Sequence, residues 1–324
     1  MTGHAAEWVP SAVRWTEAGP VVDWCHLGDL RFTDPFFEQT IGQAMNHPFN
    51  LLFAHNTPLA AVAAEADKDP ELKLSGLIFH MSRCGSTVVS QMLAALPSNV
   101  VLSEPAPIDH ILRIADRAAN MPQDQLVQCL RGMIVALGRR RQAQETDLFI
   151  KLDAWQVLLL PLIRRAFPGV PWIFCYRDPL EVLASVAQSR PMQMFPNGIR
   201  PALLTPDPAE LAALTEDEYS ALVLARYCGA AIEHHGDGGL LVEYRELPEV
   251  ACGKVLDHFG LRYGETEIKD MRAAGQFDAK NPGSRFQPDS ASKRRGASKE
   301  IRRLAEEKLA PLHARLDALR LAAG

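Results

Sequence analysis

A short apolar run, a turn of small residues and a helix-patterned segment follow one another within residues 74–96. Residues 76–80 are apolar between small residues, which predicts a buried strand, and residues 86–96 repeat apolar side chains at helical spacing. A strand that passes through a tight turn into a helix leaves backbone N–H groups unpaired at the helix start, where the helix dipole favours anions. This stretch therefore predicts a phosphate-binding loop in an α/β fold.

The turn in this stretch lacks both marks of an ATP- or GTP-binding loop. In the pattern G-x-x-x-x-G-K-[ST], the lysine contacts the β- and γ-phosphates and the hydroxyl binds Mg²⁺. With Gly85 as the second glycine, His80 stands at the first glycine position and Ser86 at the lysine position. Arg83 instead precedes Gly85 by two positions, and Ser86 and Thr87 follow it. The pattern favours another kind of phosphate loop, and a structural turn without a ligand is the alternative.

A second strand-to-helix junction comes later in the chain. Residues 171–176 form an apolar, strand-like run, an Arg-Asp-Pro sequence interrupts it, and a helical pattern then resumes. Arg177 thus ends a strand, and Ser185 lies about two turns into the next helix. The alternative is that Arg177 pairs locally with Asp178 and that Ser185 is an ordinary small helix residue.

The two junctions together resemble the PAPS-dependent sulfotransferases. In that family, the 5′-phosphosulfate loop carries Lys or Arg, a small residue, Gly and two Ser/Thr residues. The 3′-phosphate is held by an arginine at a strand end and a serine eight residues later. The resemblance implies PAPS as the donor and PAP as the product. It implies donor-binding roles for Arg83, Cys84, Gly85, Ser86, Thr87, Arg177 and Ser185.

Strand-like and helix-like segments alternate from residue 73 onward, which predicts a parallel sheet with helices on its faces. The resemblance implies the same class, an α/β fold with the three-layer α/β/α arrangement of P-loop NTPases. We expect a PAPS-binding sulfotransferase domain at residues 73–324. Residues 1–72 concentrate aromatic side chains among turn residues and predict a small α+β extension. Its aromatics either form the extension's own core or line an acceptor pocket.

Polar residues close two further predicted strands. Glu104 comes directly after residues 99–103, and Lys151 and Asp153 lie near the end of residues 148–153. Open α/β sheets bind ligands at the carboxyl ends of their strands, so Glu104 is a candidate base. An acid that merely precedes a helix is the alternative. Lys151 and Asp153 share one side of a strand, which suits a common site, and a local salt bridge between them is the alternative.

The resemblance implies catalytic roles for these residues and leaves the base open. Cytosolic members of the family carry a lysine and, two residues later, a histidine base, whereas this chain has Lys151 and Asp153. Aspartate is the poorer base unless its surroundings raise its pKa toward neutrality. Members that act on tyrosine and on certain sugars use a glutamate after the loop helix, which Glu104 resembles. Arg83 and Lys151 would stabilise negative charge, and Glu104 or Asp153 would take the acceptor's proton.

A basic run lies just before the last helical pattern of the chain. Residues 293–296, Lys-Arg-Arg-Gly, are similar to a late Arg-Lys-Gly loop that folds over the nucleotide in many family members. The resemblance implies nucleotide contacts for Arg294, Arg295 and Gly296. A solvated charge run before a helix capped by Ser298 is the alternative.

The composition and net charge of the chain limit the kinds of partner that it is expected to bind. With 34 basic and 39 acidic side chains, the formal charge is −5, which gives no electrostatic footprint for nucleic acid or an anionic membrane. No apolar run of about eighteen residues and no leader pattern is present, so we expect a cytoplasmic protein without a membrane span. The six cysteines show no C-x-x-C pair and no metal-ligand spacing, so we expect reduced thiols and no bound metal.

The predicted function is in-line transfer of a sulfuryl group from PAPS to a hydroxyl, or less readily an amine, of a small molecule, glycan or peptide. The sequence specifies neither the acceptor nor the oligomeric state. Residues 189–208, which are rich in proline, are either an acceptor-side lid or a connection. One alternative is a small-molecule kinase with a degenerate P-loop, although ATP has no 3′-phosphate for Arg177 and Ser185. The other is a non-catalytic nucleotide-binding protein of the same fold.

Overall fold

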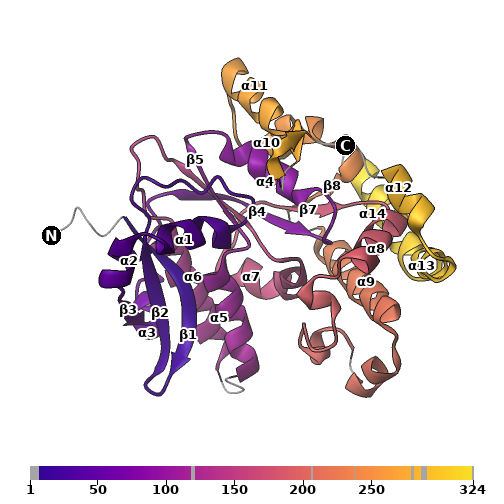
Figure 1. Cartoon of the computed structure of the whole chain (residues 1–324), viewed down its shortest axis with the longest axis horizontal. Coiled ribbons are helices and arrows are strands. Elements are labelled where there is room, and N and C mark those ends of the chain that lie inside the picture. The colour runs from indigo at the N-terminus through magenta and orange to yellow at the C-terminus, as the bar shows by residue number, and fades with distance from the viewer. Residues whose placement is uncertain are drawn as a thin grey trace.

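The centre of the molecule is a five-stranded parallel sheet with the strand order β5-β6-β4-β7-β8 (Figure 1). This computed structural model describes residues 7–117, 121–205, 207–236, 238–278, 281–285 and 290–322. The strands are β4 (Lys73–His80), β5 (Asn99–Ser103), β6 (Asp147–Lys151), β7 (Trp172–Tyr176) and β8 (Gly239–Glu243). β5 and β7 are buried along their whole length, as expected for parallel strands covered on both faces. The predicted α/β class is confirmed.

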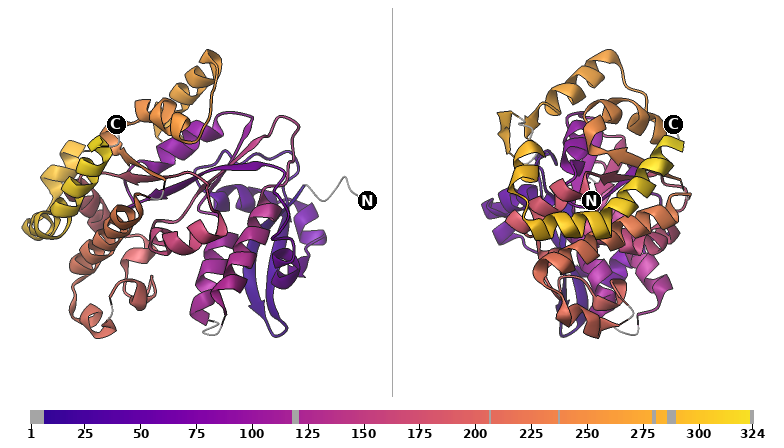
Figure 2. Two further views of the ribbon diagram at one scale, coloured as in Figure 1. Left: turned by 180° about the vertical axis from the view of Figure 1, so that it is seen from behind. Right: turned by 90° about the vertical axis from the view of Figure 1, so that its right-hand side faces the viewer.

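Helices cover both faces of the sheet (Figures 1 and 2). One face carries α4 (Ser86–Ala94), α10 (Lys254–His258) and α11 (Glu265–Ala274). The other carries α5 (Ala106–Arg117), α6 (Gln123–Leu137), α7 (Leu160–Ala166) and α9 (Glu216–His234). Beyond β7 and β8 lie α8 (Pro179–Gln188), α12 (Ser290–Gly296), α13 (Lys299–Leu304) and α14 (Ala310–Ala322). The arrangement is the predicted α/β/α sandwich.

The N-terminal extension is a small α+β unit that packs on α5 and α6. Its antiparallel sheet contains β1 (Trp8–Thr16), β2 (Gly19–His26) and β3 (Asn56–Pro58). Its helices are α1 (Phe37–Met45), α2 (Pro48–Leu52) and α3 (Leu59–Ala63). Trp24, Phe32 and Phe37 are buried, so these aromatics form core, as one of the two interpretations predicted. A boundary between residues 72 and 73 stays a prediction, because the buried core runs on from the extension into the main sheet.

Short elements connect the main ones. They are the 3₁₀ helices η1 (Ala154–Leu159), η2 (Met192–Met194), η3 (Pro201–Leu203), η4 (Pro208–Ala213), η5 (Tyr244–Glu246) and η6 (Glu249–Cys252), the π-helical turn η7 (Ala305–Leu309), and the strand pair β9 (Phe277–Asp278) and β10 (Asn281–Arg285). β6 ends at Lys151, so Asp153 lies beyond the strand that the sequence pattern predicted for it. Within the described part of the chain, no helix is both long and apolar enough to cross a membrane.

Candidate active site

A cavity of about 490 Å³ opens where the central strands end. Its lining combines residues at the carboxyl ends of β4, β5, β6 and β7, the edge at which parallel sheets bind ligands. Ten residues predicted from the sequence line it: Arg83, Cys84, Gly85, Ser86, Thr87, Glu104, Lys151, Asp153, Arg177 and Ser185. The fold therefore brings both motif segments and the four candidate catalytic residues, Arg83, Glu104, Lys151 and Asp153, to one cavity.

The turn between β4 and α4 has an unusual backbone. Ser82, Arg83 and Gly85 all have positive φ, at 73°, 54° and 82°. A Cβ atom on Gly85 would also lie 2.7 Å from the ring of Tyr244, so only glycine fits there. Left-handed backbone is costly for the two other residues and tends to occur at functional sites. The first-turn amides of α4, at Ser86 and Thr87, lack helical partners by geometry and lie in the cavity lining.

Arg83 joins the two motif segments. Its Nε donates a hydrogen bond to Oγ of Ser185 at 3.1 Å, although the two residues are 102 positions apart. Ser185 is buried in α8, and both side chains line the cavity. The two segments with the predicted spacing thus meet at a single point of the site.

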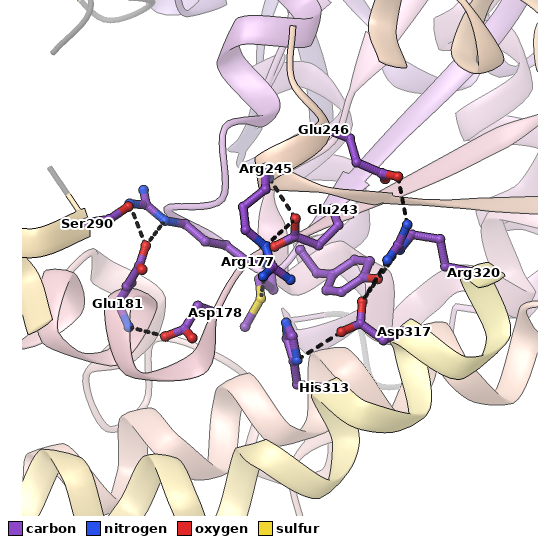
Figure 3. Close-up of polar contacts among 12 residues, drawn as sticks. Arg177, Asp178, Glu181, Glu243, Arg245, Glu246, Ser290, His313, Asp317 and Arg320 are labelled. Atoms are coloured by element: carbon purple, nitrogen blue, oxygen red, sulfur yellow. Dashed lines mark hydrogen bonds and ion pairs between the residues drawn. The ribbon is translucent and has the colours of Figure 1, made fainter. Parts of the chain in front are cut away.

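Arg177 lies at the end of β7 and is only 4% exposed. Its Nε donates to Oε2 of Glu181 at 2.8 Å, and one terminal nitrogen donates to Oγ of Ser290 at 3.1 Å (Figure 3). Its guanidinium carbon stands 3.9 Å from the centre of the Tyr244 ring. A buried, fixed guanidinium at a strand end is suited to hold a phosphate.

Glu104 and Lys151 form an ion pair across neighbouring strand ends. Lys151 Nζ donates to Oε1 of Glu104, and the backbone N–H of Glu104 donates to the carbonyl of Lys151 at 2.6 Å. Glu104 also has a positive φ of 56°. Burial would raise the pKa of Glu104, but the charge of Lys151 and the neighbouring His80 outweigh it and hold that pKa well below its usual range. Glu104 is therefore ionised and engaged at neutral pH.

Asp153 has the opposite electrostatic environment. Burial, followed by the charges of Glu104 and Asp109, raises the pKa of Asp153 to about 7. Its Oδ1 accepts a hydrogen bond from Nε2 of Gln193 at 3.4 Å, and its N–H donates to Oε1 of Gln156 at 3.2 Å. Two neighbouring carboxylates thus have pKa values pushed apart, which is how proteins assign different roles to like groups.

His80 is a member of the site that the sequence interpretation missed. Its Nδ1 accepts the N–H of Ser82 at 3.1 Å, which leaves the proton on Nε2. That nitrogen lies 3.1 Å from the carbonyl oxygen of Leu152 and 3.5 Å from Oε1 of Glu104. Burial lowers the pKa of His80, so the ring is neutral. Its position at the end of the central strand is the one sequence signal that pointed to a role.

Phe36 and Gln193 also lie in the cavity and had no motif to reveal them. Lys151 Nζ stands 5.1 Å from the centre of the Phe36 ring, so the extension contributes directly to the site. Gln193 comes from residues 189–208, the segment for which an acceptor-side lid was one of two interpretations.

The basic run in α12 is only partly turned toward the cavity. Lys293 lines it, whereas Arg294, Arg295 and Gly296 are not among the lining residues. Arg294 instead donates to Oε1 of Glu181 at 2.8 Å and to Oδ2 of Asp178 at 2.9 Å. Nucleotide contacts by these three residues stay a prediction. Among the residues described, no three His, Cys, Asp or Glu side chains group as a metal site would require.

No protein-family model matches the chain, and no curated protein matches its sequence. Solved structures resemble its fold. Sulfotransferase STF9 from Mycobacterium avium is 12% identical with a TM-score of 0.45, and the match covers 78% of this chain and 81% of that one. A sulfotransferase from Alicyclobacillus acidocaldarius is 14% identical with a TM-score of 0.44, covering 76% and 96%. Mouse sulfotransferase SULT7A1 complexed with PAP is 12% identical with a TM-score of 0.38, covering 80% and 87%.

All three structures are described as sulfotransferases, and the mouse protein is in complex with PAP. At such identities and scores, the likeness carries no weight for the chemistry of the site. Any function must therefore be supported by the cavity's own residues.

Proposed function

We propose that this chain is a sulfotransferase that moves the sulfuryl group of PAPS to an acceptor hydroxyl. The observation that carries the proposal is the meeting of the two motif segments, with Arg83 Nε 3.1 Å from Ser185 Oγ and Arg177 lining the same cavity. One segment would hold the 5′-phosphosulfate and the other the 3′-phosphate. A nucleotide with phosphate groups at both positions needs a cation from each segment in one cavity, and Arg83 and Arg177 provide one each.

The residues present fit the donor. Arg83, Arg177 and Lys293 give the cavity three cationic side chains, and the start of α4 adds backbone amides. A second cavity of about 240 Å³ shares Val88 and Tyr244 with the first and is lined mainly by apolar groups. Its position beside the cationic side suits a purine base, because aromatic and apolar surfaces accept flat rings.

When bound, PAPS supplies the reactive sulfur: the acceptor oxygen bonds to it as the bond to the bridging phosphate oxygen breaks, and that electron pair leaves with PAP. Negative charge then grows on the equatorial oxygens and the departing phosphate. Arg83 and the amides of Ser86 and Thr87 would stabilise this charge, and Lys151 in the same lining would add a further cation.

Asp153 is the base in this proposal. A base works best when its pKa lies near the working pH, and the pKa of Asp153 is raised to about 7. Glu104 has a strongly lowered pKa and is bonded to Lys151, so it suits a different task, holding the lysine in place. His80 would keep Glu104 oriented through its protonated Nε2.

The acceptor would enter between the extension and the segment after α8. Phe36, Pro191 and Gln193 line the same cavity, and Gln193 bonds to Asp153. An aromatic ring and an amide can contact the body of an acceptor while Asp153 receives the proton from its hydroxyl. These residues come from the two regions that carry no family motif, so they are also where acceptor choice would reside.

The test is transfer of radiolabelled sulfur from PAPS to a panel of phenols, sugars, aliphatic alcohols and tyrosyl peptides. We expect label in at least one acceptor class, with release of PAP and with loss of transfer in Arg83→Met. Transfer of phosphate from ATP with Mg²⁺ to the same panel, with none from PAPS, would contradict the proposal.

A further inference from the structure

One carboxylate behind the cavity is bonded to two segments that lie far apart in the sequence. Glu181 is 4% exposed and stands one turn after Arg177, in α8. Its Oε2 accepts from Nε of Arg177 at 2.8 Å, and its Oε1 accepts from Nε of Arg294 in α12 at 2.8 Å. Ser290, also in α12, bonds to the same carboxylate (Figure 3). Glu181 therefore ties the end of β7 to the C-terminal region.

Glu181 is charged in this position. Burial alone would raise the pKa of Glu181, but hydrogen bonds from Arg294, Ser290 and Arg177 outweigh burial and lower it. A buried carboxylate persists only when its charge is paired, and here both oxygens have arginine partners.

Arg177 is consequently fixed from three directions. Glu181 holds its Nε, Ser290 lies 3.1 Å from a terminal nitrogen, and the Tyr244 ring supports its flat face at 3.9 Å. A guanidinium is planar, so its ability to make paired bonds to a phosphate depends on how that plane is set.

We propose that Glu181 is the positioning residue for selectivity toward a 3′-phosphate. It sets the plane of Arg177 and anchors α12 through Ser290 and Arg294, and it acts without touching the nucleotide. The inference rests on the proposed function, since it assumes that Arg177 binds the 3′-phosphate of PAPS or PAP. It adds a residue to which neither sequence motif assigns a role.

The direction in which PAP affinity changes when Glu181 is replaced distinguishes a positioning role from a purely electrostatic effect of its charge. A negative charge beside a phosphate site repels the ligand, so removing the Glu181 charge would tighten PAP binding if charge alone mattered. If Glu181 positions Arg177, removing it loosens the guanidinium and weakens PAP binding instead. Adenosine 5′-monophosphate lacks the 3′-phosphate and should be insensitive to Glu181 in the positioning account.

The experiment is calorimetric titration of the full chain with PAP and with adenosine 5′-monophosphate. For Glu181→Gln we expect PAP to bind at least about tenfold more weakly than to the wild type, the size of a lost hydrogen bond to a charged group. The monophosphate should stay within about threefold. Asp178→Asn is the matched control, because it removes the charge that pairs with Arg294 at 2.9 Å, while asparagine can still accept the N–H of Glu181 that Asp178 accepts at 3.1 Å (Figure 3). We expect that control to keep PAP affinity within about threefold of the wild type.

Two results would overturn the inference. Unchanged or tighter PAP binding by Glu181→Gln, in a protein whose wild type prefers PAP, refutes positioning and leaves the proposed function intact. Equal binding of both nucleotides by the wild type refutes the proposed function and this inference together. If Glu181→Gln does not fold, Glu181→Asp keeps the charge but shortens the side chain, so one carboxylate no longer reaches Arg177 and Arg294 together. That variant must then weaken PAP binding but not monophosphate binding, and if it does not the inference is wrong.

Discussion

The two halves of the cavity carry charge in different ways. The proposed donor half, made of Arg83, Ser86, Thr87, Arg177, Ser185 and Lys293, brings three cations and no carboxylate into the lining, while Glu181 pairs with Arg177 outside the lining. The acceptor half, made of Phe36, Glu104, Lys151, Asp153 and Gln193, sets one lysine against two carboxylates. An excess of cations in a cavity lining attracts an anion, whereas a lining that balances cations and carboxylates can hold a group near its titration point. Under the proposed function, this difference would make the donor half responsible for PAPS affinity and the acceptor half responsible for turnover.

The largest predicted effect comes from Asp153→Asn. Loss of the base should lower kcat by about 10²–10⁴-fold, while PAP affinity changes little because Asp153 lies outside the donor half. Steady-state kinetics and calorimetry on the same preparation check both parts. Asp153→Asn with full kcat and Glu104→Gln with none would reassign the proton to Glu104.

Lys151→Met and Lys293→Met compare the two halves directly. Lys151 should contribute to the transition state, so its loss is expected to lower kcat by about 10²–10³-fold. Lys293 borders the donor half, so its loss should weaken PAP binding severalfold and leave kcat at saturation nearly unchanged. Measuring kcat and the Kd for PAP in both variants tests this division between affinity and turnover. If Lys151→Met mainly weakened PAP binding and left kcat unchanged, the division would be wrong.

Glu104→Gln should shift a pH profile and retain part of the activity. The charge of Glu104 is one of the causes that raise the pKa of Asp153, so its removal lowers that pKa. The acidic limb of the kcat–pH curve, expected near pH 7 in the wild type, should then move to lower pH. A limb that stays in place or moves upward would show that another group controls the rate.

The last predicted effect is on stability and not on activity. The pKa of Asp153 rises from an ordinary 3.8 to about 7 in the folded protein, so its stabilising contribution is complete at acid pH and is lost as pH rises through 7. Asp153→Asn should therefore unfold like the wild type near pH 4. Near pH 8 it should be more stable by up to about 4 kcal/mol. Denaturant titrations of both proteins at pH 4 and pH 8 test this prediction. If Asp153→Asn raised the free energy of unfolding equally at the two pH values, the result would argue against a raised pKa of Asp153.

Most residues of the proposed donor half could be grouped from the sequence, because they lie close together within two short segments. Residues 83–87 are adjacent in the chain, and Arg177 and Ser185 share one strand-to-helix junction, so the pattern fixed their relative positions. Alternating apolar runs similarly predicted the strands of the sheet and its class. The contact between Arg83 and Ser185 follows once the two strands are neighbours, and β4 does pair with β7.

The acceptor half depended on long-range packing that no local pattern reveals. Glu104 and Lys151 lie 47 positions apart and meet because β5 pairs with β6. Phe36 arrives from the extension, and the positive φ of Glu104 has no signature in its residue type. The raised pKa of Asp153 depends on burial and on the nearby charge of Asp109. The sequence shows neither that Asp153 is buried nor that Asp109 lies close to it. The sequence could therefore offer Glu104 and Asp153 as candidates for the proposed base but could not choose between them.

The most direct test of the central claim is calorimetric titration with PAP, ADP and adenosine 5′-monophosphate, on the wild type and on Arg177→Ala. The account predicts that PAP binds at least about tenfold more tightly than ADP and that Arg177→Ala loses most of this preference. Equal binding of the three nucleotides, or a preference for ADP in the presence of Mg²⁺, would contradict a site built for a 3′-phosphate.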